Sequence, residues 1–393
     1  MRTFSMKRFA QASLLIAAMG LSLVACGKEE ETVTSSEPIV DTTPVVVDVQ
    51  IEDNTPAGPV QLEFDGTRSY LTGLPLDPTL VGQRPVFCMY ENTLACLPHH
   101  NLDKAAIVYE CPVEGSITRY MAAFDDWQNV NPIGNIRSCR TYYAHYAAEY
   151  DGIYFHWGES VFAKPFLMSG DIDDVDALSY EWAGFKNHAA SNAFFRIGGE
   201  GEHTGFSSGE AMMKGINSLG YSLNWTNGPV KHWNFAADGS SQDLEDGTDV
   251  AVIKPYYTYN YPGFVYNAED QLYYRYEFRQ AEVDGESGNQ YAVTNVVMQM
   301  VPSSYYKEEN GANSKYLEFD LVGSGEGKYF THGKMIDVTW TKADLKDYTH
   351  FYTMDGEELV MNQGKTWYML IEDQYKENNK FYTTEEEYYA ASN

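Results

Sequence analysis

Short runs of mostly apolar residues recur through the first half of the chain, each about as long as a buried strand. Some of the stretches between them have helical spacing instead. Apolar runs of four to eight residues are typical of strands that are buried on both faces of a sheet. We therefore expect strands at residues 84–90, 105–110, 117–124, 153–157 and 192–197.

Two stretches carry the spacing and end signals of helices. Residues 138–149 begin with Ser138 and place several tyrosines at helical spacing. Residues 208–219 begin with Ser208, a favoured N-cap, and Gly220 follows as a common C-terminal stop. Because strands and helices alternate here, we predict an α/β or α+β domain from about 63 to 235.

The pattern changes after residues 236–249, a Gly/Ser/Asp-rich stretch that we interpret as a linker. Short segments rich in Tyr, Val, Phe and Trp follow, and glycine-containing turns such as 323–327 separate them. Such regular short strands predict a β-sandwich or a barrel-like domain. The expected strands lie at 250–259, 263–266, 271–278, 291–300, 315–321, 328–331, 335–341, 357–361 and 366–371.

The predicted fold class is therefore α+β. A mixed α/β N-terminal domain at 63–235 precedes a smaller β-rich domain at 250–375, which is sandwich- or barrel-like. Residues 376–393 form an acidic tail that has room for a short terminal helix. The length of 393 residues fits two domains.

The first 25 residues have the parts of a secretory signal peptide. Basic residues precede an apolar stretch at 10–25, which is short for a membrane span of about 20 residues. The sequence Leu-Val-Ala-Cys then resembles a bacterial lipobox that ends at Cys26. We predict that Cys26 is lipidated, palmitate included, and holds the chain on the outer leaflet of the cell membrane, outside the cytoplasm. The alternative is a plain signal peptide with an incidental cysteine.

Charge and composition narrow the possible partners. Residues 26–62 contain acids, prolines and few core-forming residues, so we expect a disordered acidic linker. The whole chain has 56 acidic and 27 basic residues, a formal net charge of −29. Such a charge repels nucleic acids, so no nucleic-acid partner is expected and any anion-binding site must be local.

Four further cysteines, all in the first predicted domain, offer disulfides or buried thiols. They are Cys88, Cys96, Cys111 and Cys139. An exported protein can form disulfides, but Cys88 and Cys111 lie in apolar runs, where a thiol behaves as a small hydrophobe. We favour buried thiols, with disulfides as the alternative. Because no Cys-x-x-Cys pair is present, we predict no structural zinc site.

Several ordered blocks resemble a known family. They include Leu-Thr-Gly-Leu-Pro at 71–75, Ile-Gly-Asn-Ile-Arg-Ser-Cys-Arg at 133–140 and Val-Thr-Trp-Thr-Lys at 338–342. Together they look like the YerB-like lipoproteins of Gram-positive bacteria over about residues 70–372. The resemblance implies a domain of unknown function, a dedicated C-terminal domain and a lipoprotein signal, and it implies no particular reaction. At 202–204 this chain has Glu-His-Thr where the family often has Pro-His-Asn.

Arginines gather in one part of the first predicted domain. Two of them flank the start of the helix expected at 138, whose free N–H groups favour an anion. Guanidinium groups bind phosphate or carboxylate through paired hydrogen bonds. We predict an arginine-lined pocket for an anionic cell-envelope ligand, with ligand-binding residues Arg119, Arg137, Arg140, Arg196 and His203. Internal ion pairs with nearby carboxylates would explain the same arginines without a ligand.

Two other functions stay open. The chain could be an enzyme for a phosphorylated envelope substrate, with Glu110, Glu114 or His156 as acid–base groups. It could instead be a structural protein-interaction module with ion-paired arginines. A weaker set for metal binding or proton transfer is His145, His156, His203 and Glu159, whose spacing matches no metal motif. We predict no metal and no cofactor, and the sequence leaves the oligomeric state open.

Overall fold

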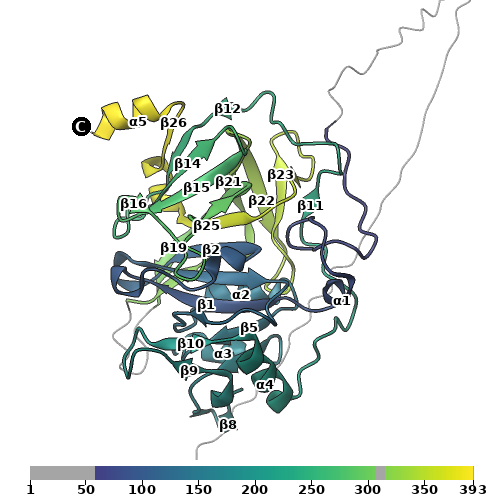
Figure 1. The fold of residues 1–393 in the computed structure, drawn as a ribbon, viewed down its shortest axis with the longest axis vertical. Helices are drawn as coiled ribbons and strands as arrows, with labels where there is room; N and C mark the ends of the chain where they lie inside the picture. The colour runs from purple at the N-terminus through teal and green to yellow at the C-terminus, as the bar shows by residue number, and fades with distance from the viewer. Residues whose placement is uncertain (1–57, 307–314, 393) are drawn as a thin grey trace, which may run out of the picture. The chain divides into compact units, whose positions relative to one another are not determined.

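The computed structural model describes residues 58–306 and 315–392 (Figure 1). These residues all belong to one compact unit of the chain. The predicted signal peptide at 1–25, Cys26 and most of the predicted linker at 26–62 lie outside the described residues. Within the described ranges, no helix is long and apolar enough to cross a lipid bilayer.

A mixed sheet of eleven strands forms the centre of the described structure, and Figure 1 shows β25, β2, β1 and β5 following one another through it. Its order is β12 (Thr248–Asp249), β22 (Lys334–Lys342), β21 (Gly323–Thr331), β18 (Asn295–Val301), β25 (Thr366–Glu372), β2 (Ile107–Pro112), β3 (Thr118–Phe124), β1 (Val86–Asn92), β5 (Ile153–His156) and β6 (Asp173–Asp176), with β23 (His350–Thr353) beside β22.

Both predicted domains contribute strands to this sheet. β2 pairs in parallel with β25, so that Ile107 lies opposite Thr366 and Glu110 lies opposite Met369. The protein is therefore sheet-rich, with a few short helices. The finer expectations, a mixed α/β first domain and boundaries at 63–235 and 250–375, stay predictions.

The remaining strands form smaller sheets. A six-stranded sheet contains β16 (Gln280–Ala281), β15 (Leu272–Glu277), β14 (Gly263–Asn267), β13 (Val252–Lys254), β26 (Lys380–Tyr382) and β17 (Ala292–Val293). A three-stranded sheet contains β4 (Ile133–Gly134), β10 (Gly205–Ser207) and β9 (Phe195–Arg196). Pairs are formed by β11 (Asn234–Phe235) with β24 (Val360–Met361), β19 (Ser303–Tyr305) with β20 (Leu317–Phe319), and β7 (Glu181–Trp182) with β8 (Phe185–Lys186).

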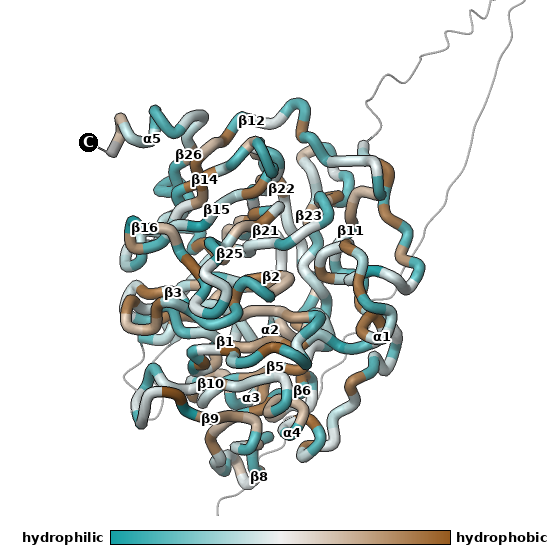
Figure 2. Tube along the Cα trace, in the orientation of Figure 1, coloured by the Kyte–Doolittle hydropathy of each residue, from teal (hydrophilic) through white to brown (hydrophobic). Residues whose placement is uncertain are grey.

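Both faces of the sheet are buried along its middle strands β18, β25, β2, β3, β1 and β5, which explains the long apolar runs in the sequence. Along β25, Trp367 and Met369 face a core shared with Phe264 of the six-stranded sheet. The alternate residue Tyr368 faces a second core shared with Tyr146 of the helix α2 (Thr141–Ala148). Figure 2 shows apolar positions along β1 and β5.

Five helices occur among the described residues: α1 (Pro78–Val81), α2, α3 (Lys164–Leu167), α4 (Gly209–Leu219) and α5 (Glu385–Ser392). The helix predicted at 208–219 is confirmed as α4, because Ser208 Oγ accepts a hydrogen bond from the Ala211 N–H at 3.3 Å. The expected terminal helix is confirmed as α5. The prediction for 138–149 was wrong at its start, since α2 begins at Thr141 with Arg140 as its N-cap.

The strand predictions of the first half are confirmed to within a few residues, except at 192–197. There a short 3-10 turn, Ser191–Ala193, precedes the two residues of β9. The turn predicted at 323–327 was wrong, because these residues open β21 and pair with β22. Gly325 lies opposite Trp340, and a Cβ on Gly325 would lie 2.6 Å from the indole nitrogen. The glycine is therefore needed for packing rather than for a turn.

Candidate functional site

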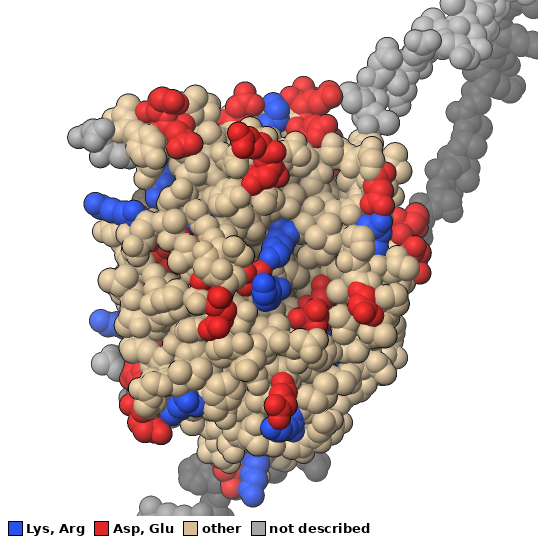
Figure 3. All heavy atoms as spheres, in the orientation of Figure 1, with Lys and Arg blue, Asp and Glu red and all other residues tan. Residues whose placement is uncertain are grey.

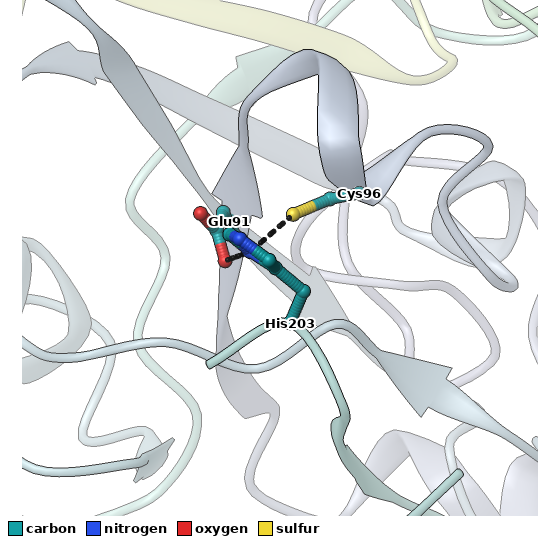
Figure 4. A group of neighbouring side chains, drawn as sticks. All are labelled: Glu91, Cys96 and His203. Atoms are coloured by element: carbon teal, nitrogen blue, oxygen red, sulfur yellow. Dashed lines mark hydrogen bonds and ion pairs between the residues drawn. The ribbon is translucent and has the colours of Figure 1, made fainter. Parts of the chain in front are cut away.

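Three potential metal-ligating side chains converge at the end of β1 (Figure 4). The Nδ1 atom of His203 lies 2.8 Å from Glu91 Oε2 and 3.4 Å from Cys96 Sγ. All three donor atoms lie within 4.8 Å of one another. Glu91 and Cys96 are buried, whereas 43% of the His203 side chain is exposed. The group therefore opens to solvent on the histidine side.

A tight turn after β1 brings Cys96 back beside Glu91. The Thr93 hydroxyl donates to Glu91 Oε1 at 3.1 Å and lies 3.4 Å from Cys96 Sγ. The Cys96 N–H donates to the Thr93 carbonyl at 2.9 Å, at the end of the 3-10 turn Leu94–Cys96. Burial is the largest cause that raises the pKa of Cys96, to about 12. Without a bound cation this sulfur is a neutral thiol.

The loop between β9 and β10 carries His203, and two predicted ligand-binding arginines hold this loop in place. Arg137 donates to the Glu202 carbonyl at 3.1 Å, and its Nε lies 3.2 Å from Glu91 Oε2. Arg196 donates to the Gly201 carbonyl at 2.6 Å. These contacts fix the histidine beside the Glu91 carboxylate.

Arg119 and Arg140 lie deeper in the same region. Arg119 is buried, and its Nη1 donates to the Ser138 carbonyl at 2.6 Å. Its buried Nε has no hydrogen-bond partner among the residues that the structure describes. Burial, followed by the charges of Arg140 and Arg137, lowers the pKa of Arg119 to about 10. Its charge is thus poorly compensated.

Carboxylates pair with the other predicted arginines. Arg140 makes a two-pronged contact to Glu114, with Nη2 2.6 Å and Nε 2.9 Å from the carboxylate oxygens. Arg196 lies 3.1 Å from Glu200 and stacks over the ring of Trp157. These pairs correspond to the ion-pairing alternative raised by the sequence. The ligand-binding roles of Arg119, Arg137, Arg140, Arg196 and His203 stay predictions.

Glu110, a candidate acid–base residue, is fully buried. It lies 2.9 Å from Arg275, whose guanidinium also contacts Glu282 at 3.1 Å. Burial is the largest cause that raises the pKa of Glu110, and burial raises the pKa of nearby Glu277 well above its usual range. Asn260 donates to both Glu110 and Glu277. This network lies between β2 and the six-stranded sheet, so its contacts are those of a structural ion cluster.

His156 is also fully buried, at the end of β5 where the sequence predicted it. Its Nε2 lies 3.1 Å from Asp174, and its Nδ1 lies 2.9 Å from the Gly158 carbonyl. Burial lowers the pKa of His156, but Asp176 and Asp174 outweigh that effect and raise it to about 9. The imidazole is therefore a cation at neutral pH.

A cavity with a volume of about 740 Å³ reaches Glu114. Tyrosines line it, together with Lys315 and the half-buried Glu372, and all of these tyrosines except the buried Tyr257 are exposed. The lining tyrosines are Tyr256, Tyr257, Tyr305 and Tyr375. Of the acid–base candidates, only Glu114 therefore faces an open space.

The sequence interpretation missed Glu91 and gave Cys96 no part in a site. A carboxylate at the end of an apolar strand, followed five residues later by a cysteine, was the available signal. His145, from the weaker set, packs against Phe166 inside the protein, and burial lowers its pKa to about 4. The four cysteines of the described part are buried free thiols, in agreement with the favoured interpretation.

Charged side chains are interspersed on the surface. The face in Figure 3 shows Asp and Glu side chains among Lys and Arg, with no continuous basic area on the described residues of that face.

Two family models match the chain in the order expected from its sequence blocks. The N-terminal domain of a protein of unknown function (DUF3048) matches residues 71–222, and the corresponding C-terminal domain matches residues 252–368. The chain belongs to this family. The resemblance inferred from the sequence is thereby confirmed.

A named relative and a solved structure support the same assignment. "Putative lipoprotein YerB" of Bacillus subtilis (strain 168) is 26% identical over 303 residues, which cover 77% of this chain and 86% of the relative. The crystal structure of the YerB protein from Bacillus subtilis matches with a TM-score of 0.66 and 25% identity. That match covers 80% of this chain and 99% of the YerB chain.

Proposed function

We propose that this DUF3048 protein is a lipoprotein, held at the outer face of the cell membrane by a lipid on Cys26. The lipobox-like Leu-Val-Ala-Cys supports this proposal, and so does the lipoprotein name of its Bacillus subtilis relative. A single acyl chain binds a membrane weakly, so stable anchoring requires more than one chain on the cysteine.

Metabolic labelling with a palmitate analogue tests the anchor. The wild-type chain should incorporate the label and fractionate with membranes, and Cys26→Ser should do neither. Cys88→Ser serves as the matched control, because Cys88 is a buried thiol that should not affect labelling. An unlabelled wild-type protein, or a labelled Cys26→Ser variant, would contradict the proposal.

The anchored domain is proposed to bind an anionic, phosphate- or carboxylate-bearing ligand of the cell envelope. The observation that carries this function is the buried guanidinium of Arg119, whose Nε is unpartnered among the described residues and which lies near Arg137 and Arg140. A buried charge without a counter-ion is costly, so an incoming anion would relieve that cost. Glu114 contacts Arg140 at the edge of the 740 Å³ cavity, where a stronger anion could displace it.

The contacts favour a binding protein over an enzyme. Glu110 and His156, two of the three acid–base candidates, are fully buried and held by Arg275 and by Asp174. The polar atoms of these two groups are already engaged within the protein. The structural module stays the alternative, since Arg137 and Arg140 are ion-paired.

Thermal shift with undecaprenyl phosphate in detergent, and with inorganic phosphate alone, tests binding. At a ligand concentration 100 times its Kd, binding stabilises a protein by about 2.7 kcal/mol, which raises Tm measurably. The shift should persist in Arg279→Ala, where the exposed guanidinium stacks over Tyr261, and disappear in Arg140→Ala. Equal shifts in both variants, or no shift with either probe, would contradict the proposal.

A further inference from the structure

We propose that Glu91, Cys96 and His203 form a binding site for one divalent transition-metal ion, and that Zn²⁺ is the ion whose chemistry fits best. The site combines one carboxylate, one thiolate and one imidazole. Zinc takes these three ligand types, whereas Mg²⁺ and Ca²⁺ prefer oxygen ligands alone. This inference is separate from the proposed anion-binding function, which is carried by the guanidinium of Arg119, although His203 belongs to both predicted sets.

The spacing of the donor atoms suits a tetrahedral ion. Bonds of about 2.3 Å to sulfur and about 2.0–2.1 Å to nitrogen or oxygen place the S and N atoms about 3.5 Å apart, and the N and O atoms about 3.3 Å apart. The observed separations are 3.4 Å for Cys96 Sγ to His203 Nδ1 and 2.8 Å for His203 Nδ1 to Glu91 Oε2. A movement of about 0.5 Å by the exposed histidine completes the geometry.

The same atoms argue against a cysteine nucleophile activated by a histidine. In a Cys–His–acid triad the sulfur and the carboxylate contact opposite nitrogens of the imidazole ring. Here both contact Nδ1, so the three donors face a common point (Figure 4). The second nitrogen, Nε2, makes no hydrogen bond to another residue in the described part of the chain, and it can carry the ring proton when Nδ1 binds a metal.

Charge and exposure agree with a three-ligand site that has an open position. On binding, Zn²⁺ replaces the thiol proton of Cys96, which leaves to solvent, and the thiolate and Glu91 then neutralise the ion. Arg137, whose Nε lies 3.2 Å from Glu91 Oε2, contacts the carboxylate from outside. Its positive charge, close to the metal, favours an anion or hydroxide in the fourth position, on the exposed side of His203.

The second convergent group, His156, Glu159 and Asp176, differs in that groups outside the set engage both ring nitrogens of its histidine. Both ring nitrogens of His156 make contacts, to Asp174 and to the Gly158 carbonyl. Asp176 accepts from the backbone of Gly158 and from Asn187. In the Glu91 group, the potential metal-ligating atoms of Glu91 and Cys96 both contact His203 Nδ1. The proposal is therefore limited to this group.

Metal titration of the full chain, purified in detergent and stripped with a chelator, tests the site. A Cys26→Ser background removes the cysteine that is predicted to carry the lipid, so that this thiol cannot compete for the metal. Competition with a chromophoric chelator should show one equivalent of Zn²⁺ bound, and Co²⁺ should give a thiolate-to-cobalt charge-transfer band. Cys96→Ser should abolish the band, and His203→Ala should weaken zinc binding at least about 100-fold, because even an outer-shell change costs about 10–100-fold.

His350→Ala is the matched control, since His350 is a partly exposed histidine that contacts Glu358 at 3.2 Å in another part of the sequence. It should bind zinc as the parent does. Unchanged far-UV circular dichroism in all variants keeps loss of binding separate from loss of fold. Absence of saturable zinc binding, a cobalt complex without the thiolate band, or wild-type affinity in His203→Ala would overturn the proposal. Loss of anion binding in Arg140→Ala with zinc binding intact would leave it standing.

Discussion

At the scale of single residues, Arg275 balances the charge of a buried network that joins β2 to the six-stranded sheet. Its guanidinium lies 2.9 Å from Glu110, 3.1 Å from Glu282 and 3.9 Å from Glu277. One cation thus faces three carboxylates in the interior. Burial raises the pKa of Glu277 well above its usual range, and burial also raises the pKa of Glu110.

Replacing Arg275 should therefore destabilise the fold strongly. Arg275→Met should lower the free energy of unfolding by about 3–5 kcal/mol, because the remaining buried carboxylates lose their counter-ion. Urea denaturation followed by tryptophan fluorescence measures the change. Arg279→Ala, an exposed neighbour on the same hairpin, should stay within about 0.5 kcal/mol of wild type. A loss below 1 kcal/mol in Arg275→Met would show that the network does not depend on this charge.

His156 should give the protein a pH-dependent stability of definite sign. Its folded-state pKa of about 9 lies above the ordinary value of 6.5. The stabilisation is therefore fully present below pH 6.5 and is lost as the pH rises through 9. The difference in unfolding free energy between wild type and His156→Gln should fall by about 3 kcal/mol from pH 6 to pH 10.

Urea unfolding at both pH values measures this difference, and comparison with the variant removes the titration of other groups. Asp174 and Asp176 hold the charged imidazole, and Lys164 contacts Glu159 of the same cluster at 3.4 Å. A difference that stays constant from pH 6 to pH 10, or grows, would mean that buried His156 is neutral.

Sequence reasoning reached the site region through Arg137 and His203, but not through Glu91 and Cys96. The arginines were visible because they are rare in an acidic chain. The contact between the strand end at Glu91 and the loop at His203 spans 112 residues, and it depends on how Arg137 and Arg196 hold that loop. A tertiary contact of this kind leaves no spacing pattern in the sequence. For the same reason the sequence did not show which carboxylates lie beside the arginines, and internal ion pairs and a ligand pocket were left as equal alternatives.

At the scale of elements, local signals predicted α4 well and β21 poorly. A cap at Ser208 and a glycine at 220 with φ +75° mark the two ends of α4 independently of the rest of the fold. The run Gly-Ser-Gly-Glu-Gly resembles a turn, but β22 and the ring of Trp340 stabilise it as a strand. Local propensity fails where a partner strand supplies the packing.

The cap of α4 can be tested by one substitution. Ser208→Ala should lower the free energy of unfolding by about 1 kcal/mol, because the Ala211 N–H loses its acceptor. Thermal unfolding monitored by circular dichroism measures the change. Ser218→Ala, in the last turn of the same helix, should stay within about 0.5 kcal/mol. Equal effects of the two substitutions would indicate that the Ser208 hydroxyl does not act as a cap.

At the scale of the whole described unit, the sequence predicted two kinds of segment but not their shared sheet. Composition distinguishes 63–235 from 250–375, and the two family models divide the chain near the same place. The pairing of β2 with β25 joins residues more than 250 positions apart in sequence. The apolar runs in both segments indicated strands that are buried on two faces, but they did not indicate which strands pair with each other.

The shared sheet leads to a prediction about cooperativity. A chain of residues 58–249 would leave β2 as a bare edge and expose the apolar side of β3 and β2 that packs against Phe264 and Trp367. An uncovered edge of this length promotes aggregation, so this fragment should be insoluble or lack a cooperative transition. The 58–393 chain should instead unfold in one calorimetric transition, since both cores span the two segments. A soluble 58–249 fragment with its own sharp transition would mean that the first segment folds alone and that β25 is added to a finished sheet.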